Sequence, residues 1–285
     1  MTLEKCLLTR NDCYRAYRKA AMTGIVIHST GANNASLKRY VQPLKSDARY
    51  GELIKLLGEN RNGNHWNLSY AAGETERQAC VHAFIGRDAS GRILTVQTLP
   101  YEICCWGVGD GRYGSYNYPP QARLQFEICE DDLKDEAYFN AAFAEAAQYC
   151  AYLCRRFGWG AERISSHYES YKAGYGGNHG DPDNWLKKFG RDMDWFRGKV
   201  AALLTVKEEE DLTKEEVLSL IEEAKEPVYH YWSEVPSWAQ APLRAMYDAG
   251  YFGGASPADL SLGRTKAELL VVIAGILKDR GILDY

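Results

Sequence analysis

Nowhere does the chain stay apolar for the roughly 18 residues that a membrane-spanning helix needs. Its first residues also lack the apolar region of a secretion signal, because Glu4, Lys5, Arg10 and Asp12 place charges there. We therefore expect a protein that is made in the cytoplasm without a signal peptide and has no membrane span.

An excess of basic residues is missing as well. The chain has 34 Lys and Arg against 38 Asp and Glu, which gives a net charge of -4 and an isoelectric point near 5.9. This balance argues against a general affinity for polyanions, so we expect no nucleic-acid partner. Hydrophobic residues make up 46% of the 285 positions, which suffices for the core of one large domain or two smaller ones.

The eight cysteines include no CxxC pair, and we therefore expect no structural zinc site built from cysteines. In a long chain without a secretion signal, we expect these thiols to be mostly reduced. Cys150 and Cys154 lie four residues apart on an apolar helical stripe, which is typical of core packing.

Over the first two hundred residues, short apolar runs alternate with helical patterns. Residues 79–85 and 92–98 flank a turn-like segment and indicate a hairpin. Together the elements predict an α/β domain, with a mixed central β-sheet flanked by helices. The other expected strands are 24–28 and 123–129, and the expected helices are 47–57, 135–157 and 191–204.

The composition changes after Leu204. An acidic run at 207–211 indicates a solvated linker, and a capping-box pattern at 213–216 predicts a helix that continues to Ala224. The rest forms a small helical domain with expected helices at 237–249 and 265–280. The predicted domains are therefore residues 1–204, a linker with a helix at 205–226, and an accessory domain at 227–285.

Three residues stand where metal ligands would be expected. His28 closes a short apolar run, His167 follows a short strand expected at 164–166, and Asp181 lies in a glycine-rich loop at 176–182. Two imidazoles and one carboxylate form the ligand set of a catalytic zinc site, with the fourth position left for water. From spacing alone, histidines that are merely hydrogen-bonded at strand ends remain the alternative.

Four motifs in one order carry a family resemblance. The motifs are IVIHST at 25–30, CVHAFIGRD at 80–88, QFEI at 125–128, and His167 followed by Asp181-Pro182. With these motifs, the chain resembles over roughly residues 20–200 the zinc-dependent N-acetylmuramoyl-L-alanine amidase family, which shares its fold with peptidoglycan recognition proteins.

The resemblance implies that His28, His167 and Asp181 bind Zn²⁺, with Asp183 as the competitor for the third position. It also implies that the protein cuts the amide bond between N-acetylmuramic acid and L-alanine in peptidoglycan. A bound zinc ion lowers the pKa of its water towards about 7 and polarises an amide carbonyl. The ligand types therefore suit this hydrolysis.

Two further residues would take part in the chemistry. Glu127 is a lone acid in an apolar strand, and a buried carboxylate needs a partner. It matches the family's catalytic Glu, whose burial would raise its pKa and suit it to proton transfer. A salt bridge or an edge position is the alternative.

His179 stands where many members have an oxyanion-stabilising Lys. If His179 must be charged, activity should fall at alkaline pH; a surface-loop histidine is the alternative.

Four residues are expected to line the substrate groove. Trp106 matches the Trp of a family Trp-His pair, but its neighbour here is Gly107, so the partner His is missing. His82 aligns with a site-lining residue, not a ligand, and core packing is the alternative. His65 and Asn64 belong to a polar loop beside Trp66 that would line a glycan groove.

The C-terminal part is similar to S-layer homology and related wall-associated modules over about 50 residues. This implies anchoring to a wall polymer, while dimerisation or simple packing remain alternatives.

The whole chain is then predicted to be an endolysin or autolysin that acts at the bacterial cell wall after release. A non-catalytic muropeptide-binding module of the same fold is the main alternative. A cell-wall cysteine peptidase is a third, although no cysteine follows a glycine-rich turn at a helix start.

Overall fold

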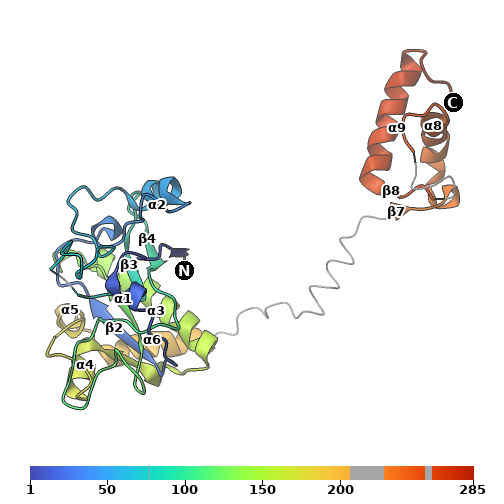
Figure 1. The fold of residues 1–285 in the computed structure, drawn as a ribbon. Helices are drawn as coiled ribbons and strands as arrows, with labels where there is room; N and C mark the ends of the chain where they lie inside the picture. The colour runs from blue at the N-terminus through green and yellow to red at the C-terminus, as the bar shows by residue number, and fades with distance from the viewer. Residues whose placement is uncertain (77, 206–227, 254–258) are drawn as a thin grey trace. The chain divides into compact units, whose positions relative to one another are not determined.

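The computed structural model describes residues 1–76, 78–205, 228–253 and 259–285. The chain divides into two compact units, Met1–Lys207 and Glu208–Tyr285 (Figure 1). The acidic run and the helix expected at 213–224 lie outside the described residues. Among the helices that are described, none combines the length and apolarity needed to cross a bilayer.

The first unit is built on a six-stranded sheet with the strand order β1-β4-β3-β5-β2-β6. Only β3 and β4 pair antiparallel, as the hairpin predicted; the other neighbours are parallel. The predicted fold class, a mixed sheet flanked by helices, is therefore confirmed. The strands are β1 (Leu3–Lys5), β2 (Ile25–Ser29), β3 (Ala83–Arg87), β4 (Ile93–Gln97), β5 (Leu124–Ile128) and β6 (Ile164–Ser166).

Six α-helices and two 3₁₀ turns complete the described part of this unit. Beside the expected long helices, short ones begin at His167 and Asp183, close to the predicted metal ligands. The helices are α1 (Asp12–Ala16), α2 (Tyr50–Leu57), α3 (Glu136–Phe157), α4 (His167–Lys172), α5 (Asp183–Lys188) and α6 (Met193–Thr205), with 3₁₀ turns η1 (Leu37–Arg39) and η2 (Ala161–Arg163).

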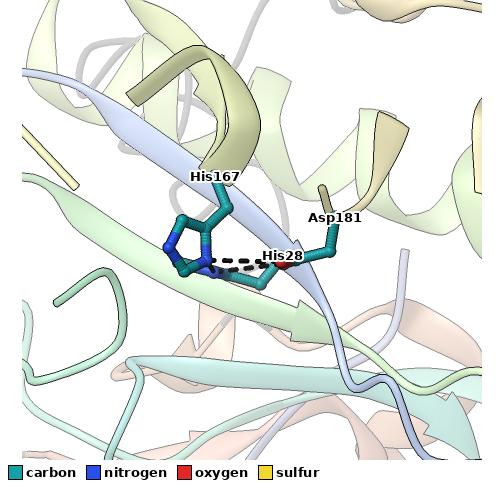
Figure 2. A group of neighbouring side chains, drawn as sticks. All are labelled: His28, His167 and Asp181. Atoms are coloured by element: carbon teal, nitrogen blue, oxygen red, sulfur yellow. Dashed lines mark hydrogen bonds and ion pairs between the residues drawn. The ribbon is translucent and has the colours of Figure 1, made fainter. Parts of the chain in front are cut away.

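One face of the sheet is polar at its centre. Side chains alternate between the two faces of a strand, so His28 of β2 lies on the same face as Gln125 and Glu127 of β5. His28 and Glu127 are register partners on these neighbouring strands. The end of β2 thereby presents His28 beside the start of α4 and the loop that carries Asp181 (Figure 2).

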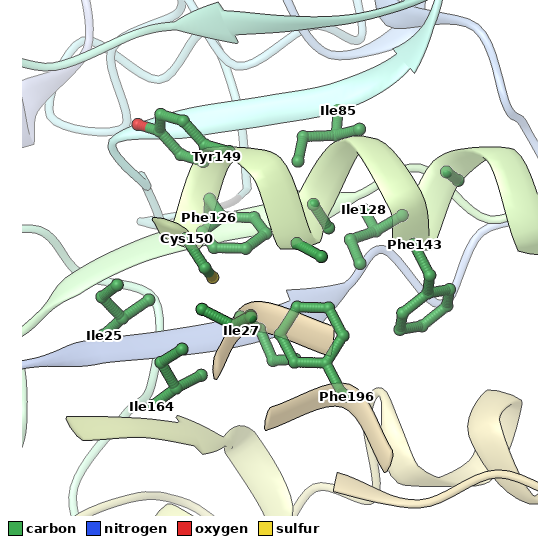
Figure 3. Close-up of a cluster of buried hydrophobic side chains, with 14 of the residues drawn as sticks. Ile25, Ile27, Ile85, Phe126, Ile128, Phe143, Tyr149, Cys150, Ile164 and Phe196 are labelled. Carbon is green, nitrogen blue, oxygen red and sulfur yellow. The ribbon is translucent and has the colours of Figure 1, made fainter. Parts of the chain in front are cut away.

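The other face of the sheet is apolar and is covered by α3 and α6. Ile27 of β2 and Phe126 of β5 pack against the α3 side chains Phe143 and Cys150, and Phe196 of α6 joins them (Figure 3). All are at most 1% exposed. This core fixes the strands from behind, so the polar residues on the opposite face are held on a rigid support.

The second unit has a core of its own. Its helices α8 (Ser237–Asp248) and α9 (Arg264–Asp279) pack together, with Leu243 and Ala274 fully buried between them. The helical character predicted for this part is confirmed. A short ladder of β7 (Val228–Tyr229) and β8 (Leu262–Gly263) and the 3₁₀ turn η3 (Trp232–Glu234) complete the unit.

Candidate metal centre

His28, His167 and Asp181 come together at the carboxyl end of β2. The Nδ1 atoms of His28 and His167 are 3.0 Å apart, and each lies 3.4 Å from an oxygen of Asp181 (Figure 2). The ligand atoms all lie within 4.8 Å of one another. Ligand atoms at 2.0–2.2 Å from one tetrahedral zinc ion would be separated by about 3.3–3.6 Å. The three side chains therefore already stand close to the spacing that one metal ion requires.

The outer nitrogen of each imidazole shows which tautomer is present. His28 Nε2 lies 3.0 Å from Gln125 Oε1, and His167 Nε2 lies 3.0 Å from the main-chain oxygen of Val108. Both partners are acceptors, so both Nε2 atoms carry the proton and donate it. The two Nδ1 lone pairs then face each other and the Asp181 carboxylate, an arrangement that a cation at its centre would stabilise.

This donor set fits zinc. Zinc-binding histidines typically donate their other ring N–H to a carbonyl or amide oxygen, which fixes the ring and its tautomer. His28 and His167 are 1% and 4% exposed, whereas the Asp181 side chain is 19% exposed. The centre is thus enclosed by protein on the histidine side and is reached from solvent past the carboxylate.

The strand β6 and its continuation into α4 hold His167. Ser166 is the N-cap of α4 and forms a capping box with Glu169, so His167 is the first helical residue. The sequence pattern Ser-His-Tyr-Glu carries this signal, but the helix was not predicted. Because β6 pairs in parallel with β2, the capped helix start brings His167 to the end of β2.

Asp181 is oriented by the main chain. The backbone N–H of Ser29 donates to Asp181 Oδ2 over 3.2 Å. This hydrogen bond turns the carboxylate towards the two imidazole Nδ1 atoms, each of which lies 3.4 Å from one of its oxygens.

Asp183, the competitor for the third position, is placed differently. It is the first residue of α5, it hydrogen-bonds Ser166, and burial raises the pKa of its carboxyl. It does not belong to the group of ligand atoms around the two histidines. The geometry therefore favours Asp181 over Asp183.

Glu127 lies beside this centre. It is 8% exposed, and β5 places it in register between His28 of β2 and Phe84 of β3. Its neighbours include Tyr40 and Cys129, whose pKa values are raised mainly by burial and to a smaller extent by the charge of Glu127. A buried acid therefore stands next to a candidate ligand on the same face of the sheet.

His179 lies at the open side of the centre. Its side chain is 68% exposed, its Nδ1 is 3.9 Å from Asp181 Oδ1, and its ring stacks on His167 with the centroids 4.7 Å apart. The stacking holds an otherwise exposed imidazole above the ligand group. His179 thus lies at the solvent-facing edge of the three-residue group.

His82 is buried below the surface of the sheet. It is 1% exposed, its Nε2 lies 2.9 Å from the Ile103 oxygen, and its Nδ1 accepts the Gln125 N–H over 3.0 Å. Burial lowers the pKa of His82 to about 4. Both ring nitrogens are used by the main chain, which favours the core-packing alternative over contact with substrate.

The other residues expected in the groove, Trp106, Asn64 and His65, lie outside the strands of the sheet. Trp106 is partly buried against a second apolar cluster, and its main-chain N–H donates to the main-chain oxygen of Cys80 over 3.0 Å. Asn64 and His65 line a polar cavity of 220 Å³ together with Arg39. Burial, with the nearby charge of Arg39, lowers the pKa of His65.

The cysteines offer no nucleophile. All eight are buried free thiols, and burial raises the pKa of the Cys80, Cys105, Cys129 and Cys150 thiols well above the ordinary value. A thiol becomes a good nucleophile only as a thiolate. The cysteine-peptidase alternative is therefore disfavoured.

The prediction of the site missed the residues that support the ligands. Gln125, Asn117 and the Val108 carbonyl bind the histidines or one another, and Glu130 binds the Ser29 hydroxyl beside Asp181. Gln125 carries the same signal as Glu127, a polar residue in an apolar strand. A main-chain carbonyl leaves no signal in a sequence at all.

Comparison with known proteins gives one family and several similar folds. No protein with a curated description matches the chain. Similar solved structures include the Staphylococcus aureus hydrolase AmiA in complex with its ligand (19% identity, 72% of this chain and 83% of that chain, TM-score 0.44). The PlyG catalytic domain is 16% identical, with 73% of this chain and 99% of that chain covered and a TM-score of 0.45. A mutant endolysin from Bacillus subtilis is also 16% identical, with 70% of this chain and 99% of that chain covered and a TM-score of 0.42. The family model described as N-acetylmuramoyl-L-alanine amidase matches residues 18–184, which include the three clustered residues and Glu127.

Proposed function

The chain belongs to the N-acetylmuramoyl-L-alanine amidase family, and from this premise we propose that it is a zinc-dependent hydrolase of peptidoglycan. The bond cut is the amide between the lactyl group of N-acetylmuramic acid and L-alanine. One observation carries the zinc dependence: two buried histidines and one carboxylate converge, with both Nδ1 lone pairs directed inward.

In this proposal, His28 Nδ1, His167 Nδ1 and the Asp181 carboxylate hold Zn²⁺. When bound, zinc supplies a water of lowered pKa and polarises the scissile carbonyl. The residues around it supply the remaining steps. Ser29 keeps the Asp181 carboxylate turned towards the histidines, and the apolar core behind β2 and β5 keeps the arrangement rigid.

Glu127 acts as the general base and then as the general acid. It takes a proton from the attacking water and returns it to the nitrogen of the leaving L-alanine. Its register position next to His28 supports this role, because a general base must reach both the water and the leaving group. Its low exposure favours proton transfer inside the site over exchange with bulk water.

His179 stabilises the oxyanion of the tetrahedral intermediate. Its stacked position on His167 lets it donate a hydrogen bond, in place of the Lys that many family members have here. Trp106, His65 and Asn64 are proposed to line the substrate groove. For His82, both of whose ring nitrogens are taken, we propose a structural role.

Metal analysis of the purified full chain tests the zinc proposal. We expect one zinc ion per chain, loss of turnover on chelation, and recovery when zinc is returned. Asp181→Asn should lower zinc content and turnover together, whereas Asp183→Asn, the matched control, should keep zinc. Full turnover by the metal-free chain, or zinc loss only in the Asp183 variant, would contradict the assignment.

The alternative is a module of the same fold that binds muropeptides without cutting them. Retention of all three candidate ligands and of Glu127 favours the enzyme. Binding of muropeptide with no cleavage by a chain that carries one zinc ion would instead establish the module. The two outcomes are separated by mass spectrometry of the bound peptide.

As an endolysin or autolysin, the protein would act at the bacterial cell wall after release. We propose that the second unit anchors it there. Tyr231, Trp238 and Tyr251 are more than half exposed, as are Leu269 and Val272 on α9, and exposed apolar groups mark interaction surfaces. Co-sedimentation with purified walls tests this, and a dimer in solution with no wall binding would favour the dimerisation alternative.

A further inference from the structure

Gln125 is a fully buried amide that the proposed chemistry does not use. It is 0% exposed and lies on β5 two residues before Glu127, on the same face of the sheet. Its Oε1 is 3.0 Å from His28 Nε2, and its Nε2 donates to Asn117 Oδ1 over 3.0 Å. A buried amide with all these contacts has only one orientation.

Asn117 decides that orientation. Its Oδ1 also accepts the main-chain N–H groups of Gly107 and Val108, at 3.1 and 3.2 Å, so this atom must be an oxygen. The Gln125 group that faces it must then be the NH₂ group, which leaves Gln125 Oε1 directed at His28. The N–H of His28 is therefore forced onto Nε2.

The same asparagine supports the second histidine. Asn117 binds the Val108 N–H, and the Val108 oxygen accepts from His167 Nε2. The outer hydrogen bond of His28 thus leads through Gln125 to Asn117, which is 5% exposed, and that of His167 ends at the oxygen of Val108, whose N–H Asn117 also binds. The amide pair sets the His28 tautomer, and the Val108 carbonyl sets that of His167.

Gly107 makes room for this arrangement. A Cβ at position 107 would lie 2.4 Å from Gln125 Oε1 and 2.9 Å from Val81 Cγ1. The glycine stands where the family resemblance led us to expect a histidine. Any side chain there would displace the Gln125 amide, so the identities of residues 107 and 125 depend on each other.

We propose that Gln125 is the positioning residue that sets the His28 tautomer for metal binding. Asn117 fixes the orientation of the Gln125 amide, and Gly107 leaves the space that this amide occupies. The inference rests on the proposed zinc function. Outer hydrogen bonds of this kind typically change metal affinity by about 10- to 100-fold. The role is one of positioning, because the fully buried Gln125 side chain acts through its hydrogen bonds to His28 and Asn117.

A double-mutant cycle on the full chain tests the coupling, with zinc affinity measured by competition against a chromophoric chelator. Gln125→Met keeps the side-chain length but cannot accept from His28, and we expect about 10- to 100-fold weaker zinc binding. Gly107→Ala should weaken binding similarly, and the double variant should be no weaker than the worse single one. Gly198→Ala, with no atom within 4 Å of the added Cβ, is the control and should bind zinc normally.

Nitrogen NMR of histidine in the metal-free wild type gives a readout that needs no variant. At about pH 9, where an ordinary histidine is neutral, His28 should carry its proton on Nε2, and Gln125→Met should populate the other tautomer. Unchanged zinc affinity in both single variants, additive losses, or a wild-type proton on Nδ1 would overturn the inference. A wild type that binds no zinc would contradict the proposed function instead. The NMR measurement would still show whether Gln125 sets the His28 tautomer.

Discussion

At the residue scale, the account depends on which atoms face the centre of the site. His28 and His167 direct Nδ1 inward because Gln125 and the Val108 carbonyl take the outer N–H groups. Asp181 completes the group because the Ser29 N–H turns its carboxylate towards them. The role of a histidine therefore depends on its contacts and not on its residue type alone. His82 and His65 have the same side chain as His28 and His167, but they lie outside this group.

Glu127→Gln should separate proton transfer from metal binding. The amide keeps the shape of the side chain but cannot accept a proton, so we expect turnover to fall by about 10²- to 10⁴-fold. Zinc content and thermal stability should stay near those of the wild type. Turnover within a few-fold of the wild type, in a variant that keeps its zinc, would remove Glu127 from the mechanism.

His82→Gln should change how stability depends on pH. Burial lowers the folded-state pKa of His82 to about 4, from an ordinary value of 6.5. Folding therefore favours the neutral form of His82. The stability that this adds to the folded protein is complete above about pH 6.5 and is lost as the pH falls towards 4. The loss should be on the order of 3 kcal/mol.

Urea unfolding of both proteins at several pH values measures this effect. The stability gap between wild type and His82→Gln should narrow as the pH falls from about 7 to about 4.5. A gap that stays constant would mean that His82 titrates normally in the folded protein.

At the element scale, the start of α4 links the fold to the site. Ser166 is 0% exposed and caps the helix whose first residue is His167. Ser166→Ala leaves the Glu169 N–H without its acceptor, and we expect a loss of about 1 kcal/mol of unfolding free energy together with weaker zinc binding. Ser36, the N-cap residue of η1, makes no such side-chain bond, so Ser36→Ala should change neither quantity. Equal effects of the two substitutions would contradict this role.

The element scale also shows how far the sequence predicts the structure. Periodicity located the strand that ends near His28 and the long helix α3, because both bury a continuous apolar pattern. The helix expected at 47–57 begins only at Tyr50, since Asp47 accepts the Arg49 N–H over 2.8 Å and stabilises a turn instead.

The clustering of the three candidate ligands was foreseeable only through the family resemblance. The support of His28 by Gln125 was not foreseeable, because it depends on where Asn117 and Gly107 come in space. The Val108 carbonyl belongs to the backbone and is independent of side-chain identity. The sequence therefore indicated the residues that cluster, and the structure added the residues that orient them.

At the scale of the whole molecule, the chain consists of two units with separate cores. Leu243→Ala removes a fully buried side chain from the second unit and should cost about 2–5 kcal/mol of its stability. We expect reduced binding to intact walls and unchanged turnover of a soluble muropeptide. Leu269→Ala, at a position 59% exposed, should leave the unit folded. Lost turnover of the soluble substrate in the Leu243 variant would show that the units depend on each other.

The identity of the cleaved bond tests the central claim most directly. Peptidoglycan digested by the zinc-loaded full chain is analysed by mass spectrometry for new amino-terminal and reducing ends. We predict stem peptides that begin with L-alanine, no new reducing sugar ends, and no such release by Asp181→Asn. New reducing ends, cleavage within the stem peptide, or equal release by Asp181→Asn would contradict the account.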